Sequence, residues 1–202
     1  SDLFLLEILL LSHPLSSETL VYSLIKNLAV SLTFPLSAYF HLRNVARTRK
    51  FITDDAAKSL LHAFITSRID YCNSLLFGVP QSSLAKLQHV QNSAARLVMR
   101  KKKYDHITPT LVDLHWLPVA HRIKFKLLLL IFISLNGMSP GYICDLLQPY
   151  HPPQALCSAD ASILQVPLTR LVTCGDRAFS VSGPKLWNSL PSNLRNSSNL
   201  FS

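Results

Sequence analysis

Two adjacent carboxylates, Asp54 and Asp55, are the residues whose type and spacing come nearest to a catalytic arrangement. Neighbouring aspartates hold pairs of metal ions in enzymes that transfer phosphoryl groups along nucleic acids. Here Ile52, not an aromatic residue, stands two positions before the pair, and no alternating strand pattern flanks it. Thr53 is a good N-cap, and carboxylates in a first turn suit the helix dipole. We therefore predict that the pair begins a helix and is not catalytic.

Other catalytic and metal-binding patterns are not found in the sequence. His115 and His121 stand six positions apart, and with His106 and Cys72 they do not match a zinc signature. The chain has no Gly-x-Ser-x-Gly motif and only 5 glycines, too few for a glycine-rich phosphate loop. The sequence therefore predicts no catalytic residue, no metal site and no cofactor.

Positive charge is the strongest remaining chemical signal, and it is concentrated in the middle of the chain. The 202 residues carry a net charge of +9. Residues 43–126 hold 15 Lys and Arg against 5 Asp and Glu, a net of +10, whereas the rest holds 5 against 6, a net of −1. Cations opposite phosphates release condensed counterions, so this pattern predicts binding to RNA or DNA through the phosphate backbone, with low sequence specificity. The alternative is a merely solvated basic face.

The predicted interface rests on cations from several segments. Four of them are adjacent and follow a predicted helix, where the helix dipole also favours positive charge. They form one surface only if the helices pack side by side. The candidate phosphate-binding residues are Arg43, Arg47, Lys50, Arg96, Arg100, Lys101, Lys102, Lys103, Arg122, Lys124 and Lys126. The candidate stacking groups among them are Tyr104, His106 and Trp116.

Composition predicts a folded intracellular protein. Apolar residues make up 49% of the chain, charged residues 15%, and the mean hydropathy is +0.25, so a sizeable core can form. The apolar runs Leu3–Leu11 and Leu127–Ile133 are shorter than the roughly 20 residues that span a bilayer, so no membrane partner is expected. The cysteines are far apart and predict free thiols in the nucleus or cytoplasm, not a secreted disulfide framework. They are Cys72, Cys144, Cys157 and Cys174.

Apolar periodicity predicts the helices that must position the cations. The expected segments are Leu36–Lys50, a helix capped by Thr53, a helix from Ser82 or Ser83 to Arg100, a short helix opened by Thr108 and Pro109, and Val119–Asn136 closed by Gly137. A further short helix is expected from Ser139 and Pro140 to about Leu147. In the first segment, Phe40, Leu42 and Val45 are expected on the apolar side and Arg43, Arg47 and Arg49 on the polar side.

The domain prediction has three parts. Residues 1–35 are poorly patterned, residues 36–148 form a basic helical domain, and residues 149–202 are a Pro-rich extended segment followed by a C-terminal element. Ile163–Val166 and Leu168–Thr173 are expected to pair, and a helix over residues 176–190 is expected to break or kink near Gly183 and Pro184. The predicted fold is mostly α, an irregular helical bundle with a small extended or β-hairpin element near residues 163–174.

Ordered blocks of sequence from about Lys26 to the C-terminus resemble the region after the catalytic core of reverse transcriptases from non-LTR (LINE-type) retrotransposons. The vertebrate chicken-repeat clade is closest in style. Lys26–Val30 resembles the family's post-catalytic strand, so residues 1–35 are expected to be a remnant of that region. The other blocks are His41–Arg47, Ser67–Leu76, Leu87–Leu97, Asp105–Pro109, Leu114–Val119, Arg122–Ile123, Gly175–Ser180 and Leu186–Pro191.

The resemblance implies a thumb-like part of an RNA-directed DNA polymerase that grips template and primer through phosphates. The family's metal-binding aspartates lie upstream, and neither they nor its endonuclease domain has a match here, so we expect no enzymatic activity. Because the chain begins at Ser1, we expect a trimmed start or a piece of a longer reading frame. The alternative is a structural module that packs against a polymerase domain of the same parent and does not bind nucleic acid by itself.

Overall fold

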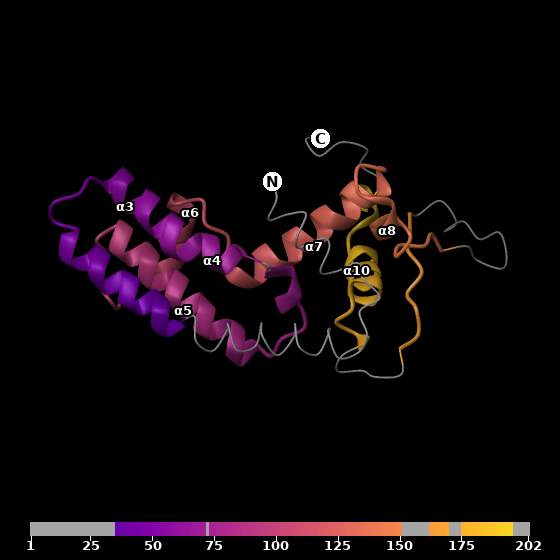
Figure 1. Ribbon diagram of the computed structural model, residues 1–202, viewed down its shortest axis with the longest axis horizontal. Helices are drawn as coiled ribbons and strands as arrows, with labels where there is room; N and C mark the ends of the chain where they lie inside the picture. Colours follow the sequence, from indigo (N-terminus) through magenta and orange to yellow (C-terminus); the bar gives the residue numbers. More distant parts are fainter. Residues whose placement is uncertain (1–34, 72, 151–161, 170–174, 196–202) are drawn as a thin grey trace. The chain divides into compact units, whose positions relative to one another are not determined.

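The computed structural model describes residues 35–71, 73–150, 162–169 and 175–195 (Figure 1). These residues are mostly helical and form no strand or sheet, which confirms the predicted fold class. The chain divides into two compact units, a first unit from Leu15 to Ile123 and a second unit that contains Lys124–Ser202 with Ser1–Pro14. This division falls inside a helix and does not coincide with the predicted boundaries at 35/36 and 148/149.

The first unit is a bundle of helices joined by short turns. Residues 35–48 are helical, as predicted. A π-helical turn, His62–Thr66, and a 3-10 turn, Asn73–Leu76, lie between the helices that follow. These helices are α3 (Asp54–Leu61), α4 (Ser67–Asp70), α5 (Gln81–Val98) and α6 (Ile107–Asp113). The next helix, α7 (Val119–Leu135), begins in the first unit and continues into the second.

The core of the first unit lies between the helix over 35–48, α3 with its π-helical turn, and α5. The first of these helices buries Ala38, Leu42 and Val45, whose spacing places them on one face. They pack with a cluster in which each fully buried aliphatic side chain contributes about 1.5–3 kcal/mol. The other members are Leu61, Ile65, Ile69, Leu87, Val90, Ala94, Val98, Val119 and Ile123.

Two side-chain placements predicted for the helix over 35–48 are wrong. Phe40 is exposed, not on the apolar side, because its position in the helical repeat is opposite the Ala38–Leu42–Val45 face. Arg49 is buried, not on the polar side, because it lies one turn beyond Val45 on the face that meets α5.

Helix starts agree with the sequence prediction at α3 but not at α5 and α6. The Thr53 hydroxyl accepts the Ala56 N–H at 3.3 Å, and Asp54 and Asp55 occupy the first turn, as predicted. In contrast, α5 begins one or two residues earlier than predicted, with Pro80 at its N-cap, and α6 begins after His106. Pro109 still lies in the first turn, where a missing N–H removes no helical hydrogen bond.

Three helices end in the same motif, with one residue in the left-handed region. These residues are Arg100 after α5, His115 after α6 and Gly137 after α7, with φ of 51°, 54° and 67°. In each case the next N–H donates to the carbonyl oxygen five residues back, at 2.8–3.0 Å. Gly137 is as predicted. At Arg100 and His115 a side chain occupies a conformation that costs roughly 1–2 kcal/mol.

The second unit contains the rest of α7 and three further helices. They are α8 (Gly141–Cys144), shorter than predicted, α10 (Phe179–Asn188) and α11 (Ser192–Arg195). The predicted break at Gly183 and Pro184 is wrong, because α10 is continuous through both residues. A Cβ at Gly183 would lie 3.4 Å from Ile131 Cδ1, so glycine permits the close approach of α10 to α7.

The extended segment near residue 163 does not pair as predicted. Leu164 forms an isolated antiparallel bridge with Pro149, and the Asn188 side-chain amide bonds both the N–H and the carbonyl of Leu164. Asn188 therefore satisfies the backbone groups that a hairpin partner would otherwise bond. The rest of the predicted partner, residues 170–173, lies outside the described residues.

Candidate nucleic-acid interface

The buried guanidinium of Arg49 organises one end of the first unit. It is 6% exposed and donates to the carbonyl oxygens of Leu97 and Val98 at 3.2 and 2.8 Å and of Ile52 at 3.2 Å. The Leu97 and Val98 carbonyls end α5, where no intrahelical partner is available. A cation there also complements the helix dipole. Arg49 therefore fastens the end of the helix over 35–48 to the end of α5.

Asp54 completes this arrangement from the start of α3. Its Oδ1 lies 2.5 Å from Arg49 Nη2 and 3.6 Å from Arg100 Nη2. The hydrogen bond from Arg49 holds the pKa of the Asp54 carboxyl below its usual value, and the charges of Arg49, Arg100 and Lys58 act in the same direction. Asp54 is thus an ion-pair partner at a helix start, as the capping pattern suggested.

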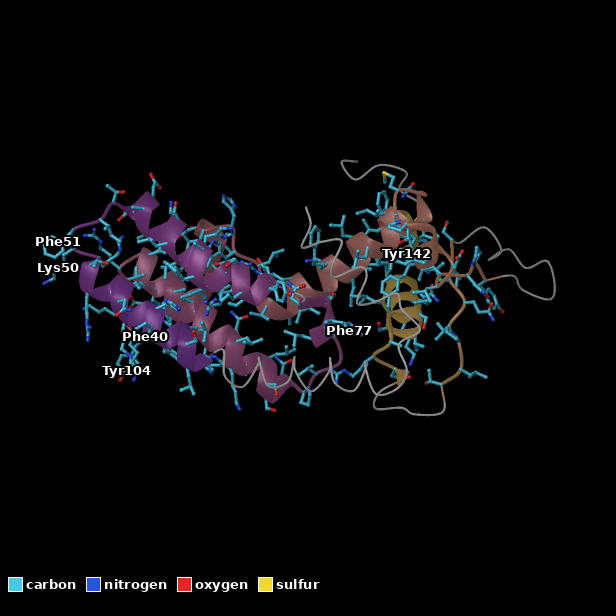
Figure 2. All side chains as sticks on the ribbon, viewed as in Figure 1. Phe40, Lys50, Phe51, Phe77, Tyr104 and Tyr142 are labelled. Carbon is cyan, nitrogen blue, oxygen red and sulfur yellow. The ribbon has the colours of Figure 1, made fainter. Side chains whose placement is uncertain are left out.

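Because Arg49 joins these two helix ends, candidate cations far apart in sequence come together. Lys50 directly follows Arg49, and Arg100, Lys101, Lys102 and Lys103 follow α5. All five side chains are exposed, and we call them the basic rim. Lys50 lies at the left end of the first unit in Figure 2. Among described residues, no carboxylate pairs with Lys50 or with the three lysines of the rim.

Arg43 and Arg47 extend the basic rim along the helix over 35–48. Both are exposed, and their spacing of four residues, followed by three to Lys50, places them in one row. The row lies opposite the buried face of Ala38, Leu42 and Val45. The helix therefore presents cations directly away from the core.

A tight turn holds the lysines of the basic rim. The Lys102 N–H donates to Asp105 Oδ2 at 2.8 Å, and the Asp105 N–H donates to the Lys102 carbonyl at 3.3 Å. Half-buried Arg96 donates to the Asp105 carbonyl at 3.4 Å. Arg96, a predicted phosphate contact, therefore supports the turn from inside.

Arg122, Lys124 and Lys126 are not brought to the basic rim. Arg122 Nη1 lies 2.7 Å from Asp70 Oδ2, with only 14% of its side chain exposed, and its Nε donates to the Leu117 carbonyl at 2.8 Å. Gln91 donates to the same carbonyl, and Gln88 accepts the first N–H of α7. Lys124 and Lys126 belong to the second unit.

Replacing Arg122 with glutamine tests whether it is structural. We expect the free energy of unfolding to fall by about 1.5–3 kcal/mol, because a charge-assisted bond is lost and Asp70 loses its cation. Urea unfolding measures this, and Lys124→Gln, an exposed neighbour on α7, should change it by less than about 0.5 kcal/mol. An unchanged midpoint together with weaker nucleic-acid binding would make Arg122 a phosphate contact.

The three predicted stacking groups differ in exposure. Tyr104 is 89% exposed, and Lys103 Nζ lies 5.7 Å from its ring centroid. His106 is exposed but sits at the N-cap position of α6. Trp116 is half-buried, packs against the core and lines an open pocket of about 440 Å³. Tyr104 is thus the best presented of the three.

Sequence reasoning missed an aromatic cluster, which we call the aromatic ladder: Phe40, His41 and Phe64. The rings of His41 and Phe64 stack at 4.9 Å and 8°, and Phe40 meets His41 edge-on at 5.6 Å and 76°. Phe64 lies in the π-helical turn. The spacing of Phe40 three residues before Arg43 and seven before Arg47 was the available signal, since it places all three on one helix face.

The described residues limit other functional classes. Among them, no three His, Cys, Asp or Glu side chains gather where they could hold a metal ion. No described helix combines the length and apolar character needed to cross a membrane. Cys144 carries a free thiol, 3.2 Å from the Ser139 hydroxyl.

Comparison of the chain with protein-family models, curated proteins and solved structures finds no match. Several of the blocks that resemble reverse transcriptases nevertheless share a structural role. Asp70, Gln88, Gln91, Leu117 and Arg122 come from four of those blocks and form the polar network at the start of α7. This network accounts for those residues through packing, so the function must be argued from the exposed side chains.

Proposed function

We propose that the first unit binds RNA or DNA through the phosphate backbone, with low sequence specificity and without catalysis of its own. One observation carries the proposal. Lys50 and Lys101–Lys103, about fifty positions apart in sequence, gather at one end of the unit, and no described carboxylate neutralises them. Such a concentration of exposed cations is the electrostatic footprint of a polyanion site.

The chemistry of these side chains favours backbone contacts over base readout. A lysine ammonium is a compact, mobile point charge that suits phosphate oxygens and carries no base information by itself. Arg43 and Arg47 extend the row along the helix, so a strand of phosphates can follow it. The resemblance to a thumb-like region of reverse transcriptases supports the same proposal, since it implies a grip on template and primer phosphates.

A salt series tests the proposal on the full chain. The logarithm of the binding constant should fall linearly with the logarithm of salt concentration, with a slope near −0.9 for each duplex phosphate contacted. In the variant with Lys101, Lys102 and Lys103 replaced by glutamine, the slope should flatten by up to about 2.7. Fluorescence anisotropy with a labelled DNA duplex, between about 50 and 200 mM salt, measures both slopes.

The matched control removes the same charge elsewhere. Lys58, Lys86 and Lys185 are replaced by glutamine; they are exposed and lie outside the basic rim. This variant should keep the wild-type slope. Equal flattening in both variants would show that net charge alone matters and would contradict a local site. Absent or salt-independent binding would also contradict the proposal and would favour the alternative, a module that packs against a polymerase domain.

A further inference from the structure

The aromatic ladder leaves a large apolar ring in solvent beside cations. Phe40 is 61% exposed, on the face opposite the core. Burying a phenylalanine side chain gains about 1.5–3 kcal/mol, and that gain is not realised at this position. Phe40 shares its face with Arg43 and Arg47. Exposed aromatic rings along a positively charged row are the arrangement that binds single-stranded nucleic acids.

Phe40 is held in position by its neighbours. His41 meets its edge and is itself stacked on Phe64, and Arg68 Nη1 donates to the Ser37 hydroxyl at 3.0 Å, joining α4 to the same helix. A ring fixed in this way loses little conformational freedom when a base stacks on it, which favours binding.

Tyr104 supplies a second exposed ring within the turn of the basic rim. It lies between Lys103 and Asp105 in sequence and is almost fully exposed. Figure 2 shows Phe40 and Tyr104 both projecting from the lower edge of the first unit. The two rings therefore accompany the two cationic segments, one on the helix and one on the turn.

We propose that the occupant of this surface is a single strand of nucleic acid, whose bases stack on Phe40 and Tyr104 while its phosphates contact Arg43, Arg47 and the basic rim. This inference rests on the proposed function and adds the strandedness of the ligand. A duplex cannot use the rings in this way, because its bases are already stacked on one another. The cations favour a polyanion over a neutral protein surface as the partner.

The test compares three probes on the full chain: an oligothymidylate of about twelve nucleotides, an abasic strand with the same number of phosphates, and a duplex of that length. The wild-type protein should bind the oligothymidylate about 5-fold or more tightly than the abasic strand for each stacked base. Phe40→Leu and Tyr104→Leu should each narrow this ratio, and the double variant should abolish it. Affinity for the abasic strand and the duplex should not change.

Tyr142→Leu is the matched control, since Tyr142 is an exposed ring on α8 in the second unit. It should leave the ratio at the wild-type value. Leucine is at least as good a helix former as phenylalanine, so Phe40→Leu should fold. A ratio of one in the wild-type protein, or an unchanged ratio in the double variant, overturns the inference but leaves phosphate binding in place. Failure of all three probes to bind would overturn the proposed function as well.

Discussion

Replacing Arg49 with methionine should lower the free energy of unfolding by about 3 kcal/mol or more. Methionine keeps the length of the side chain but removes every donor, so the carbonyl oxygens of Ile52, Leu97 and Val98 lose their bonds to a charged group. Each such bond contributes about 1.5–3 kcal/mol. In a Trp187→Phe background, Trp116 is the remaining tryptophan and lies in the first unit, so its fluorescence during urea unfolding measures the change.

Arg47→Met is the matched control, because Arg47 has the same side chain two residues earlier but is exposed. It should change the free energy of unfolding by less than about 0.5 kcal/mol. Arg49→Lys should restore only part of the loss, since one ammonium cannot reach carbonyls in three directions as a guanidinium does. Similar unfolding midpoints for Arg49→Met and Arg47→Met would show that the buried guanidinium does not hold the two helix ends.

The same variant should show a distinct pH dependence. The pKa of Asp54 is lowered in the folded protein, chiefly by the Arg49 hydrogen bond. This interaction therefore stabilises the fold above the unfolded pKa of about 3.9, and the contribution is lost as pH falls through the folded value. The difference between wild type and Arg49→Met should narrow below about pH 4, without vanishing, because the backbone carbonyls still accept from Arg49 in the wild type.

Leu61→Ala should destabilise the first unit by about 2–5 kcal/mol. Leu61 is completely buried at the end of α3, in the cluster shared with α5 and the helix over 35–48. Truncation removes apolar surface from the core and leaves a cavity that the surrounding helices fill only in part. Urea unfolding followed by Trp116 fluorescence in the same background measures the loss.

Leu36→Ala makes the same chemical change at a position that is 77% exposed. It should alter the free energy of unfolding by less than about 0.5 kcal/mol, because little buried surface is lost. Equal effects at Leu36 and Leu61 would mean that the buried cluster does not stabilise the first unit. The pair therefore tests whether the core is placed as described.

These results bear on binding as well as on stability. Arg49 does not contact solvent, yet its bonds determine where Lys50 and the turn after α5 lie relative to each other. Loosening this junction would separate the two cationic segments without removing any of their charges. Salt-dependent binding should therefore weaken in Arg49→Met under conditions where most of the protein remains folded.

The sequence predicted the helices well where the local signal was strong. Apolar periodicity and the Thr53 and Gly137 caps identified α3 and α7, because capping hydrogen bonds and left-handed glycine depend on residues close in the chain. It misplaced the starts of α5 and α6 by one or two residues, where serine and threonine offered plausible caps that the fold does not use. The pairing of Leu164 with Pro149 and Asn188 joins distant residues, so no local pattern could indicate it.

By itself the sequence determined that this protein is mostly helical, has an apolar core and concentrates its positive charge between residues 43 and 126. Local periodicity and composition suffice for those conclusions. Only the tertiary structure decided which cations belong together. Arg49 and Arg122 carry the same charge as Arg47, but helix packing buries them against carbonyl and carboxylate oxygens, while Lys50 and Lys101–Lys103 stay exposed at one end. A cation's role depends on its neighbours in space, and those are set by long-range packing.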